Sequence, residues 1–183
     1  MLRTNDDTIV AIATPVGIGG IGVIRLSGEN ALNLVCQCIS GIKNVKPRYV
    51  HFGDIIDPDS KQPIDQACII YFKGPQSYTG EDVVELQTHS SPYVLQKLLQ
   101  ICLTLGARLA TKGEFTKRAF IHGKLDLTQA ESVIDLIHSE SEKAHRVSLA
   151  HIDGVLYRFI STIRSVIKPF IETIEGSIDF PDE

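Results

Sequence analysis

The sequence predicts an α+β fold followed by a segment of bundle helices, and three features lead to this prediction. Two short apolar stretches, residues 8–14 and 22–27, flank a glycine-rich turn and are typical of strands. Residues 92–104 have helical spacing, with Pro92 in the first turn. After residue 128 the apolar residues recur every three or four positions, which indicates helices alone.

The earlier part of the chain supplies the mixed half of this fold. Residues 49–56 and 67–72 are predicted to pair as a β-hairpin, because Asp57-Pro58-Asp59-Ser60 between them has the composition of a turn. A further strand is predicted over residues 83–88. We also expect a helix over residues 30–39, an end to helix 92–104 at Gly106, a short apolar segment over 108–110 and a short helix over 113–121.

The last third is predicted to be helical. Thr128 and Glu131 have the spacing of a capping box, so a helix is expected to begin there, and Pro169 is expected to kink the last helix because it removes an amide donor. Two or three helices cannot bury the apolar stripe of this segment, so more polypeptide or another subunit must cover it. The stripe comprises Val155, Phe159, Ile163, Val166, Ile167, Phe170, Ile171 and Ile174.

Composition excludes several classes of protein. With 183 residues, 43% hydrophobic and 22% charged, the chain falls outside the disordered and collagen-like ranges. No apolar run approaches the roughly 18 residues of a membrane-spanning helix, and the polar, acidic start gives no sign of a secretory signal. The four cysteines form no C-x-x-C pair, so we expect reduced thiols in the cytoplasm and no metal site.

Charge is unevenly distributed along the chain. Residues 1–127 contain 13 Lys and Arg against 12 Asp and Glu, whereas residues 128–183 contain 5 against 10. An overall basic field that would attract nucleic acid is therefore missing, and RNA contact would need a local patch or another chain. One stretch could form such a patch, although it also fits an ordinary solvated helix and loop. It comprises Arg108, Lys112, Lys117, Arg118 and Lys124.

The run Gly17-Ile18-Gly19-Gly20-Ile21-Gly22 resembles a phosphate-binding loop. It lacks a following Lys-Ser or Lys-Thr and leads into a strand, so no GTP or ATP site is predicted from it. A close strand-to-strand connection explains the glycines better, and a ligand on the far side remains allowed. No nucleophile with its base is visible, which argues against a free-standing nucleotide-dependent enzyme, and we assign no catalytic residue.

Three charged residues occupy positions where charge is costly or unusually placed. Arg25 lies inside a predicted strand, where it needs a carboxylate or an anionic ligand. Glu85 shares a strand face with Val83; if that face is inward, the carboxylate needs donors, which the edge of a pterin, purine or pyrimidine could supply. A solvent-facing glutamate on an edge strand is the alternative. Lys124 follows a glycine in a loop that could hold its ammonium toward an anion.

Nearby residues fit structural roles. Glu114 and Arg118 lie four apart and are predicted to pair on one helix face, with Phe115 and Phe120 facing the core. His89 could act as a general base, although a structural histidine is the simpler interpretation.

Several motifs then point to one family: Asp7-Thr8-Ile9-Val10-Ala11, Ile24-Arg25-Leu26-Ser27-Gly28, Tyr78-Thr79-Gly80-Glu81-Asp82, Gly113-Glu114-Phe115, Gly123-Lys124-Leu125-Asp126-Leu127 and Ile178-Asp179-Phe180-Pro181. Taken in order over essentially the whole chain, they resemble the tRNA-modification GTPases of bacteria and organelles called MnmE or TrmE. The resemblance implies an N-terminal tetrahydrofolate-binding and dimerisation domain over residues 1–120, with a fold similar to that of glycine-cleavage T-proteins. It also implies the first part of a helical domain over residues 121–183.

The resemblance carries further expectations about chemistry and partners. The family's GTPase domain is inserted past Glu183, so GTP, Mg²⁺ and K⁺ belong to the full-length family, and the absence of G-x-x-x-x-G-K-[ST] agrees with this. The implied cofactor is 5-formyl- or 5,10-methylene-tetrahydrofolate, which supplies one carbon to a tRNA wobble uridine. The implied partners are a second copy of the chain, the flavoprotein MnmG (GidA) and tRNA, in the cytoplasm and without a membrane.

By the same resemblance, the family's folate contacts fall on Arg25, Glu85 and Lys124. Two departures from the family's pattern affect this region: His89-Ser90-Ser91 replaces His-Gly-Gly, and His122 replaces Asn. The family's C-terminal cysteine motif is absent, so none of the four cysteines inherits its role. The alternative to folate binding is a dimerisation and docking module without folate turnover.

Overall fold

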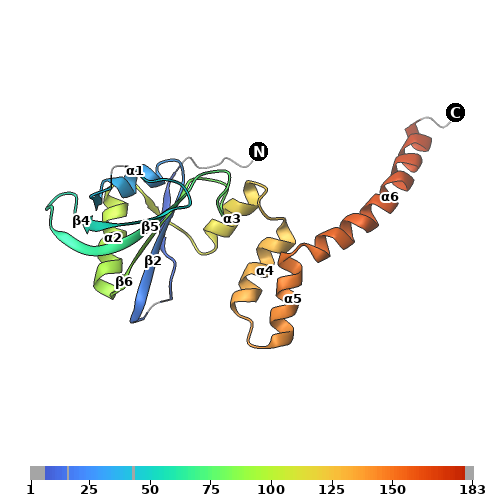
Figure 1. The fold of residues 1–183 in the computed structure, drawn as a ribbon. Helices are drawn as coiled ribbons and strands as arrows, with labels where there is room; N and C mark the ends of the chain where they lie inside the picture. Colours follow the sequence, from blue (N-terminus) through green and yellow to red (C-terminus); the bar gives the residue numbers. More distant parts are fainter. Residues whose placement is uncertain (1–6, 16, 43, 180–183) are drawn as a thin grey trace. The chain divides into compact units, whose positions relative to one another are not determined.

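The computed structural model describes residues 7–15, 17–42 and 44–179, and of Asp179 only the backbone. Two compact units make up the chain, Met1–Lys124 and Leu125–Glu183, and each is described by itself (Figure 1). Val16 of the glycine-rich run and the segment Phe180-Pro181-Asp182-Glu183 lie outside the described residues.

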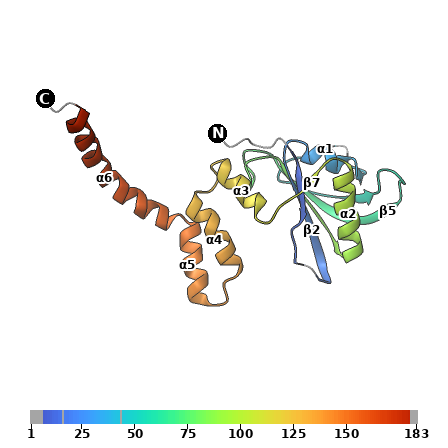
Figure 2. The same ribbon diagram turned by 180° about the vertical axis from the view of Figure 1, so that it is seen from behind.

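The first unit is built on a seven-stranded mixed sheet with the strand order β3-β4-β5-β6-β2-β1-β7 (Figures 1 and 2). All neighbouring pairs are antiparallel except β1 and β7, which run parallel. The strands are β1 (Ile9–Ile12), β2 (Gly19–Ser27), β3 (Ile39–Ser40), β4 (Val50–Ile56), β5 (Pro63–Phe72), β6 (Val83–Ser90) and β7 (Arg108–Leu109). The predicted strands and the β4–β5 hairpin are therefore confirmed. β3 was not predicted, because two residues carry no period.

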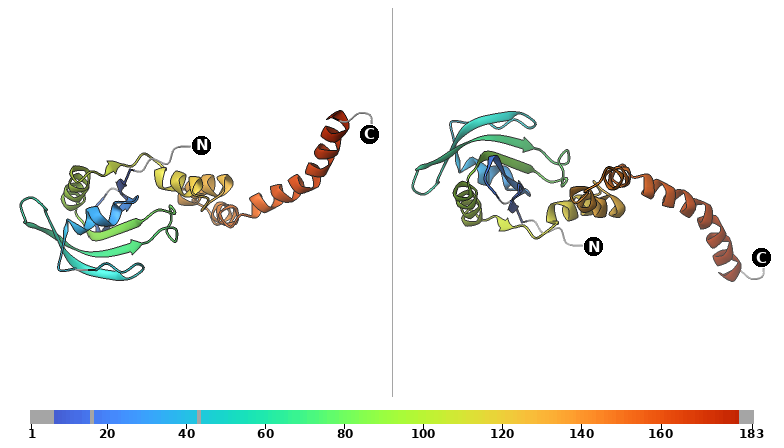
Figure 3. Two further views of the ribbon diagram at one scale, coloured as in Figure 1. Left: turned by 90° about the horizontal axis from the view of Figure 1, so that it is seen from above. Right: turned by 90° about the horizontal axis from the view of Figure 1, so that it is seen from below.

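Helices α1 (Ala31–Cys36) and α2 (Pro92–Thr104) cover one face of this sheet (Figure 3). Strand side chains alternate between the two faces, and the even-numbered residues of β2 and β6 point at these helices. The resulting core includes Ile24, Leu26, Val84, Leu86, Leu34, Val35, Leu95 and Leu98, all buried. Burial of this apolar surface is the main stabilising term of the unit.

One glycine of β2, Gly22, has a packing reason. A Cβ on Gly22 would lie 2.8 Å from a methyl group of Leu95 and 3.1 Å from the Cα of Ser90. Such distances are below van der Waals contact, so only glycine lets α2 pack this close to the strand. The strand begins at Gly19, three residues earlier than predicted, and part of the glycine-rich run lies inside it.

The opposite face of the sheet presents the odd-numbered residues of β2 and β6, and we call it the open face. Register pairs Arg25 with Glu85, and Glu85 with Ile70 of β5, so these three side chains share this face. Helix α3 (Glu114–Ile121) follows β7 and contributes Phe115 next to Arg25.

The second unit contains α4 (Leu127–Ile137), α5 (Glu142–Ile152) and α6 (Val155–Asp179). Helices α4 and α5 pack together, with Ser132 and Ser148 buried. The predicted cap at Thr128 is wrong. Asp126 is the N-cap, and its carboxylate accepts the Gln129 amide proton at 2.9 Å while the Gln129 side chain accepts from the Asp126 amide at 2.8 Å. Asp126 is itself a good cap residue and stands one residue before the helix.

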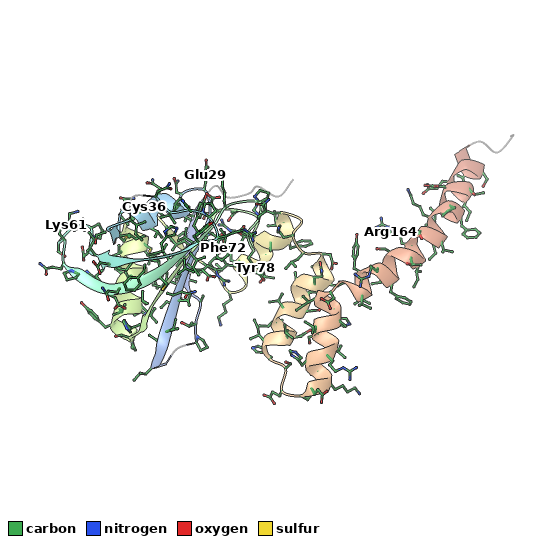
Figure 4. The ribbon with its side chains drawn as sticks, viewed as in Figure 1. Glu29, Cys36, Lys61, Phe72, Tyr78 and Arg164 are labelled. Carbon is green, nitrogen blue, oxygen red and sulfur yellow. The ribbon has the colours of Figure 1, made fainter. Side chains whose placement is uncertain are left out.

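Helix α6 runs for 25 residues through Pro169 and curves along its length (Figure 3). Its predicted apolar stripe is exposed: Phe170, for example, has 67% of its surface accessible. Most of the described side chains of α6 are exposed, as Arg164 shows (Figure 4). Within the described residues, none of the helices combines the length and apolarity needed to cross a bilayer.

Candidate functional site

Arg25 and Glu85 form a cross-strand ion pair on the open face. The two residues are directly opposite in the β2–β6 register; the Arg25 Nε donates to Glu85 Oε1 at 2.8 Å, and Nη2 lies 2.7 Å from the same oxygen. Both nitrogens thus contact one carboxylate oxygen. Among the described residues, nothing donates to Oε2. Since no buried side-chain oxygen in this part of the chain lacks a partner, Oε2 is accessible from outside.

The pair is partly buried, with 32% of the Arg25 side chain and 16% of the Glu85 side chain accessible. A carboxylate at this depth must be compensated, and Arg25 supplies one half of that compensation. Of the two alternatives that the sequence leaves open for Glu85, a solvent-facing glutamate on an edge strand does not apply, because β6 lies between β2 and β5 and Arg25 supplies a donor to the partly buried carboxylate. The remaining acceptor, Oε2, offers a fixed hydrogen-bonding position to a ligand.

Two aromatic rings flank the Arg25 guanidinium. Its Cζ lies 5.9 Å from the ring centroid of Tyr78 and 5.7 Å from that of Phe115, both within cation–π distance. Tyr78 comes from the loop over residues 73–82, as Figure 4 shows, and Phe115 comes from α3. The Tyr78 hydroxyl lies 2.9 Å from Thr116 Oγ1. Sequence reasoning did not single out Tyr78. The available signal was an aromatic residue inside a polar, glycine-containing loop.

Lys124 lies in the turn after α3, where Gly123 has φ +68°. Its ammonium donates to the carbonyl of Pro75 at 3.0 Å, and its stem packs near Gly80. Within the described residues it makes no hydrogen bond or ion pair with Glu85. The structure thus joins Arg25 to Glu85 directly and connects Lys124 to them through the loop that carries Tyr78.

This loop is fixed by polar contacts at both its ends. Thr79 is fully buried, and its hydroxyl lies 2.7 Å from Ser27 Oγ on β2. The carbonyl of Thr79 lies 2.7 Å from Nδ1 of His122. Asp82 accepts from the Tyr71 hydroxyl at 2.6 Å and from the Gly74 amide at 2.9 Å. Burial raises the pKa of Tyr71, and the hydrogen bond to Asp82 raises it further. His122, a departure from the family pattern, therefore supports the loop.

Beneath the loop lies an ionic cluster that holds it against α3. Arg118 is 7% exposed and donates to Asp7, Glu81 and Glu114, at 2.6, 3.0 and 3.3 Å respectively. Arg108 binds Asp7 and Glu114 as well. The hydrogen bond from Arg108 lowers the pKa of Glu114 to about 2. The predicted Glu114–Arg118 pair is confirmed as part of this larger cluster.

The cluster corrects two sequence predictions. The possible basic patch is reduced to Lys112, Lys117 and Lys124, which are exposed, because Arg118 is buried and Arg108 is paired with carboxylates. Phe120 does not face the core, since it is 38% exposed. Phe120 comes five positions after Phe115 in the helix, so the two side chains point about 140° apart around its axis.

His89 pairs with the carboxylate of Asp65, which agrees with a structural role rather than with that of a general base. Its Nδ1 lies 2.7 Å from Asp65 Oδ1 and its amide donates to Oδ2 at 2.9 Å. Burial raises the pKa of Asp65, but the hydrogen bonds from His89 outweigh it, so the net pKa is below the ordinary value. The imidazole borders a shallow hollow of about 330 Å³ on the open face. The other lining residues are Gly20, Ile21, Phe52, Gln66, Cys68, Gln87 and Thr88.

Two of the four cysteines, Cys38 and Cys102, are buried. Burial raises the pKa of Cys38 to about 11 and that of Cys102 to about 12. Thiols with such pKa values stay protonated at neutral pH and are poor nucleophiles. In the part of the chain that the structure describes, no three His, Cys, Asp or Glu side chains converge as metal ligands.

Comparison with known proteins places this site in a family. Residues 8–124 match the family model described as GTP-binding protein TrmE N-terminus, and residues 127–183 match the MnmE helical domain. The chain is 46% identical over 177 residues to the tRNA modification GTPase MnmE of Aquifex aeolicus, covering 97% of this chain and 39% of that protein. It is 48% identical over 176 residues to the protein of the same name from Chromobacterium violaceum, covering 96% of this chain and 39% of that protein.

The MnmE of Thermus thermophilus is 44% identical over 179 residues, with 97% of this chain and 41% of that protein covered. The chain thus spans about two fifths of the length of the relatives it matches. Both family models and these relatives agree over nearly all of its residues. The chain belongs to the MnmE (TrmE) family of tRNA modification GTPases.

Proposed function

We propose that this chain is the folate-binding and dimer-forming N-terminal part of a tRNA modification GTPase. The observation that carries the proposal is the Arg25–Glu85 pair, which leaves Glu85 Oε2 accessible beside two aromatic rings. A carboxylate oxygen held in this way suits the ring N–H and exocyclic amino group of a pterin. In this proposal Glu85 accepts from the pterin, and Arg25 and Lys124 engage the carbonyl, formyl or glutamate side of the cofactor.

The residues present fit a tetrahydrofolate. Its reduced pterin presents adjacent donors and its glutamate tail is anionic, whereas the region supplies one acceptor oxygen and two cations. Lys124 is exposed and binds only a backbone carbonyl, so an anionic group could compete for its ammonium. When bound, 5-formyl- or 5,10-methylene-tetrahydrofolate would supply the one-carbon unit. The mixed sheet with helices on one face agrees with a glycine-cleavage T-protein-like fold, which is part of this proposal.

Calorimetric titration of the 183-residue chain with 5-formyltetrahydrofolate tests the proposal. We expect Glu85→Ala to weaken binding by about 2 kcal/mol, or about 30-fold in Kd, because it removes a charged hydrogen-bond acceptor. Glu29→Ala is the matched control, since Glu29 is exposed outside the site, and it should leave Kd unchanged. Unchanged affinity in Glu85→Ala would refute the role of Glu85.

The remaining expectations concern the whole protein. We propose that GTP hydrolysis, with its Mg²⁺ and K⁺, resides in the part of the relatives that this chain does not cover. We further propose that the full-length protein acts on tRNA wobble uridine in the cytoplasm, together with the flavoprotein MnmG (GidA). Loss of the wobble modification in a strain that carries Glu85→Ala would support this, and normal modification would oppose it.

A second candidate is a dimerisation and docking module that does not turn over folate. Exposed apolar side chains on the first unit favour it, since such side chains often mark protein interfaces. They are Ile18, Ile21, Tyr49, Val50 and Phe52. Sedimentation with and without folate separates the candidates: both predict a homodimer, but only the first predicts folate uptake.

A further inference from the structure

The proposed folate site has aromatic walls that the assigned polar residues do not explain. Tyr78 and Phe115 come from two different segments, and their ring centroids lie 5.9 and 5.7 Å from the Cζ of Arg25. Tyr78 remains 39% exposed and Phe115 is half-buried, so ring surface is still accessible at this point of the open face. An exposed aromatic side chain held in a fixed orientation is a ready stacking surface.

Contacts between the loop over residues 73–82 and α3 hold the two rings in place. The loop that carries Tyr78 is tied to α3, which carries Phe115, by the Arg118–Glu81 ion pair at 3.0 Å. The Tyr78 hydroxyl reaches Thr116, the neighbour of Phe115, at 2.9 Å. These contacts fix the spacing of the two rings before any ligand arrives, and preorganisation of this kind lowers the entropic cost of binding.

The rings are also within reach of a ligand bound at Glu85. Arg25 Nε and Nη2 bind Glu85 Oε1, so the guanidinium and the free Oε2 are neighbours. A flat heterocycle whose edge donates to Oε2 therefore lies next to the guanidinium, whose Cζ is 5.9 and 5.7 Å from the two ring centroids. Stacked and edge-to-face aromatic pairs are favourable at about 4.5–7 Å between centroids.

We propose that Tyr78 and Phe115 are ligand-contacting residues, and that their rings cover the heterocycle whose edge binds Glu85. The inference rests on the proposed folate site and adds the groups that recognise the flat shape of the ligand. It differs from a structural role in which the rings only hold Arg25 through cation–π contacts.

Calorimetric titration with 5-formyltetrahydrofolate provides the affinities. Tyr78→Leu and Phe115→Leu should each raise Kd by about tenfold, because each removes a ring contact. Tyr78→Phe keeps the ring and should stay within about twofold of the wild-type chain. Tyr93→Leu, an exposed tyrosine on α2, should do the same and serves as the matched control.

Proton NMR of the bound ligand separates direct contact from an effect through Arg25. Ring currents should shift the pterin and formyl protons upfield in the wild-type chain, and less so in Tyr78→Leu. Unshifted ligand protons with wild-type Kd values in both leucine variants would overturn the inference while leaving folate binding intact. If the wild-type chain takes up no folate, the proposed function itself fails and the inference falls with it. Circular dichroism checks that each variant is folded. If a variant is not folded, the shifts of the ligand protons in the NMR spectrum of the wild-type complex decide whether the rings contact the ligand.

Discussion

The two units of the chain treat their side chains in opposite ways. The first unit buries even charged groups: Arg118 is almost inaccessible and pairs with the carboxylates of Asp7, Glu81 and Glu114. The second unit exposes apolar groups along α6, where Phe159, Val166 and Phe170 all face solvent. A buried charge is destabilising unless its partners are well placed. A large exposed apolar surface, in contrast, usually marks a site that a partner covers. The difference indicates that a buried ionic cluster stabilises the first unit, whereas α6 presents a continuous apolar stripe suited to a partner.

Arg118→Met should produce the largest effect and tests the ionic cluster of the first unit. The change removes the arginine partner of Glu81 and one of the two arginine partners of Asp7 and Glu114, and it should lower the free energy of unfolding by about 3–5 kcal/mol. Urea denaturation followed by circular dichroism measures it. Lys117→Met on the exposed side of the same helix is the control and should change stability by less than about 0.5 kcal/mol. Equal effects of the two variants would contradict the idea that the cluster holds the unit together.

Gly22→Ala should have the next largest effect and sharpens the same point for packing. The added methyl group meets Leu95 and the backbone of Ser90, so we expect a loss of about 1–3 kcal/mol in thermal or urea unfolding. Gly20→Ala is the matched control, because nothing lies within 4 Å of a Cβ built there. A neutral Gly22→Ala would mean that α2 can move away from the sheet at little cost.

Acid should weaken the first unit through Glu114. Its pKa is depressed to about 2 in the folded chain, so its stabilising contribution is complete above its unfolded pKa of about 4.3. That contribution is lost as the pH falls from about 4.3 towards 2, and we expect about 1 kcal/mol from this group. Urea denaturation at several pH values measures it. In Arg108→Met the pKa of Glu114 should be less depressed, so the loss should be smaller and should be complete at a higher pH; an unchanged profile would oppose the assignment.

Phe170→Ser should have the smallest effect and tests the exposed stripe of α6. The side chain loses no buried contact, and serine and phenylalanine have similar helix propensities, so the change should stay within about 0.5 kcal/mol. A loss above about 1 kcal/mol in urea denaturation would show that this face is already covered in solution, by a second copy of the chain.

The sequence predicted the elements better than their contacts. Pro92, Gly106 and the alternation of β2 and β6 set boundaries that local chemistry alone decides, and the structure agrees with them. Contacts between distant segments were less accessible to prediction. That Arg25 faces Glu85 depends on a register between residues 60 positions apart, which only the family resemblance suggested.

The failures have the same origin. Arg118 reads as surface in its own helix, and its burial depends on Asp7 and Glu81, which are 111 and 37 residues away. Tyr78 reads as a loop residue, and its importance appears only when Phe115 is placed beside it. At Thr128 the error was local: two good capping residues competed, and Asp126 had the better position.

The Arg25–Glu85 pair also determines how binding at the proposed folate site should depend on salt concentration. Because the guanidinium already cancels the carboxylate's charge, an uncharged ring that docks there meets oriented dipoles with no net field. Its uptake should therefore depend little on ionic strength, whereas any anionic tail that Lys124 holds should be released as salt is added. The ring of the proposed cofactor would thus be bound through shape and hydrogen bonding, and its anionic tail through charge.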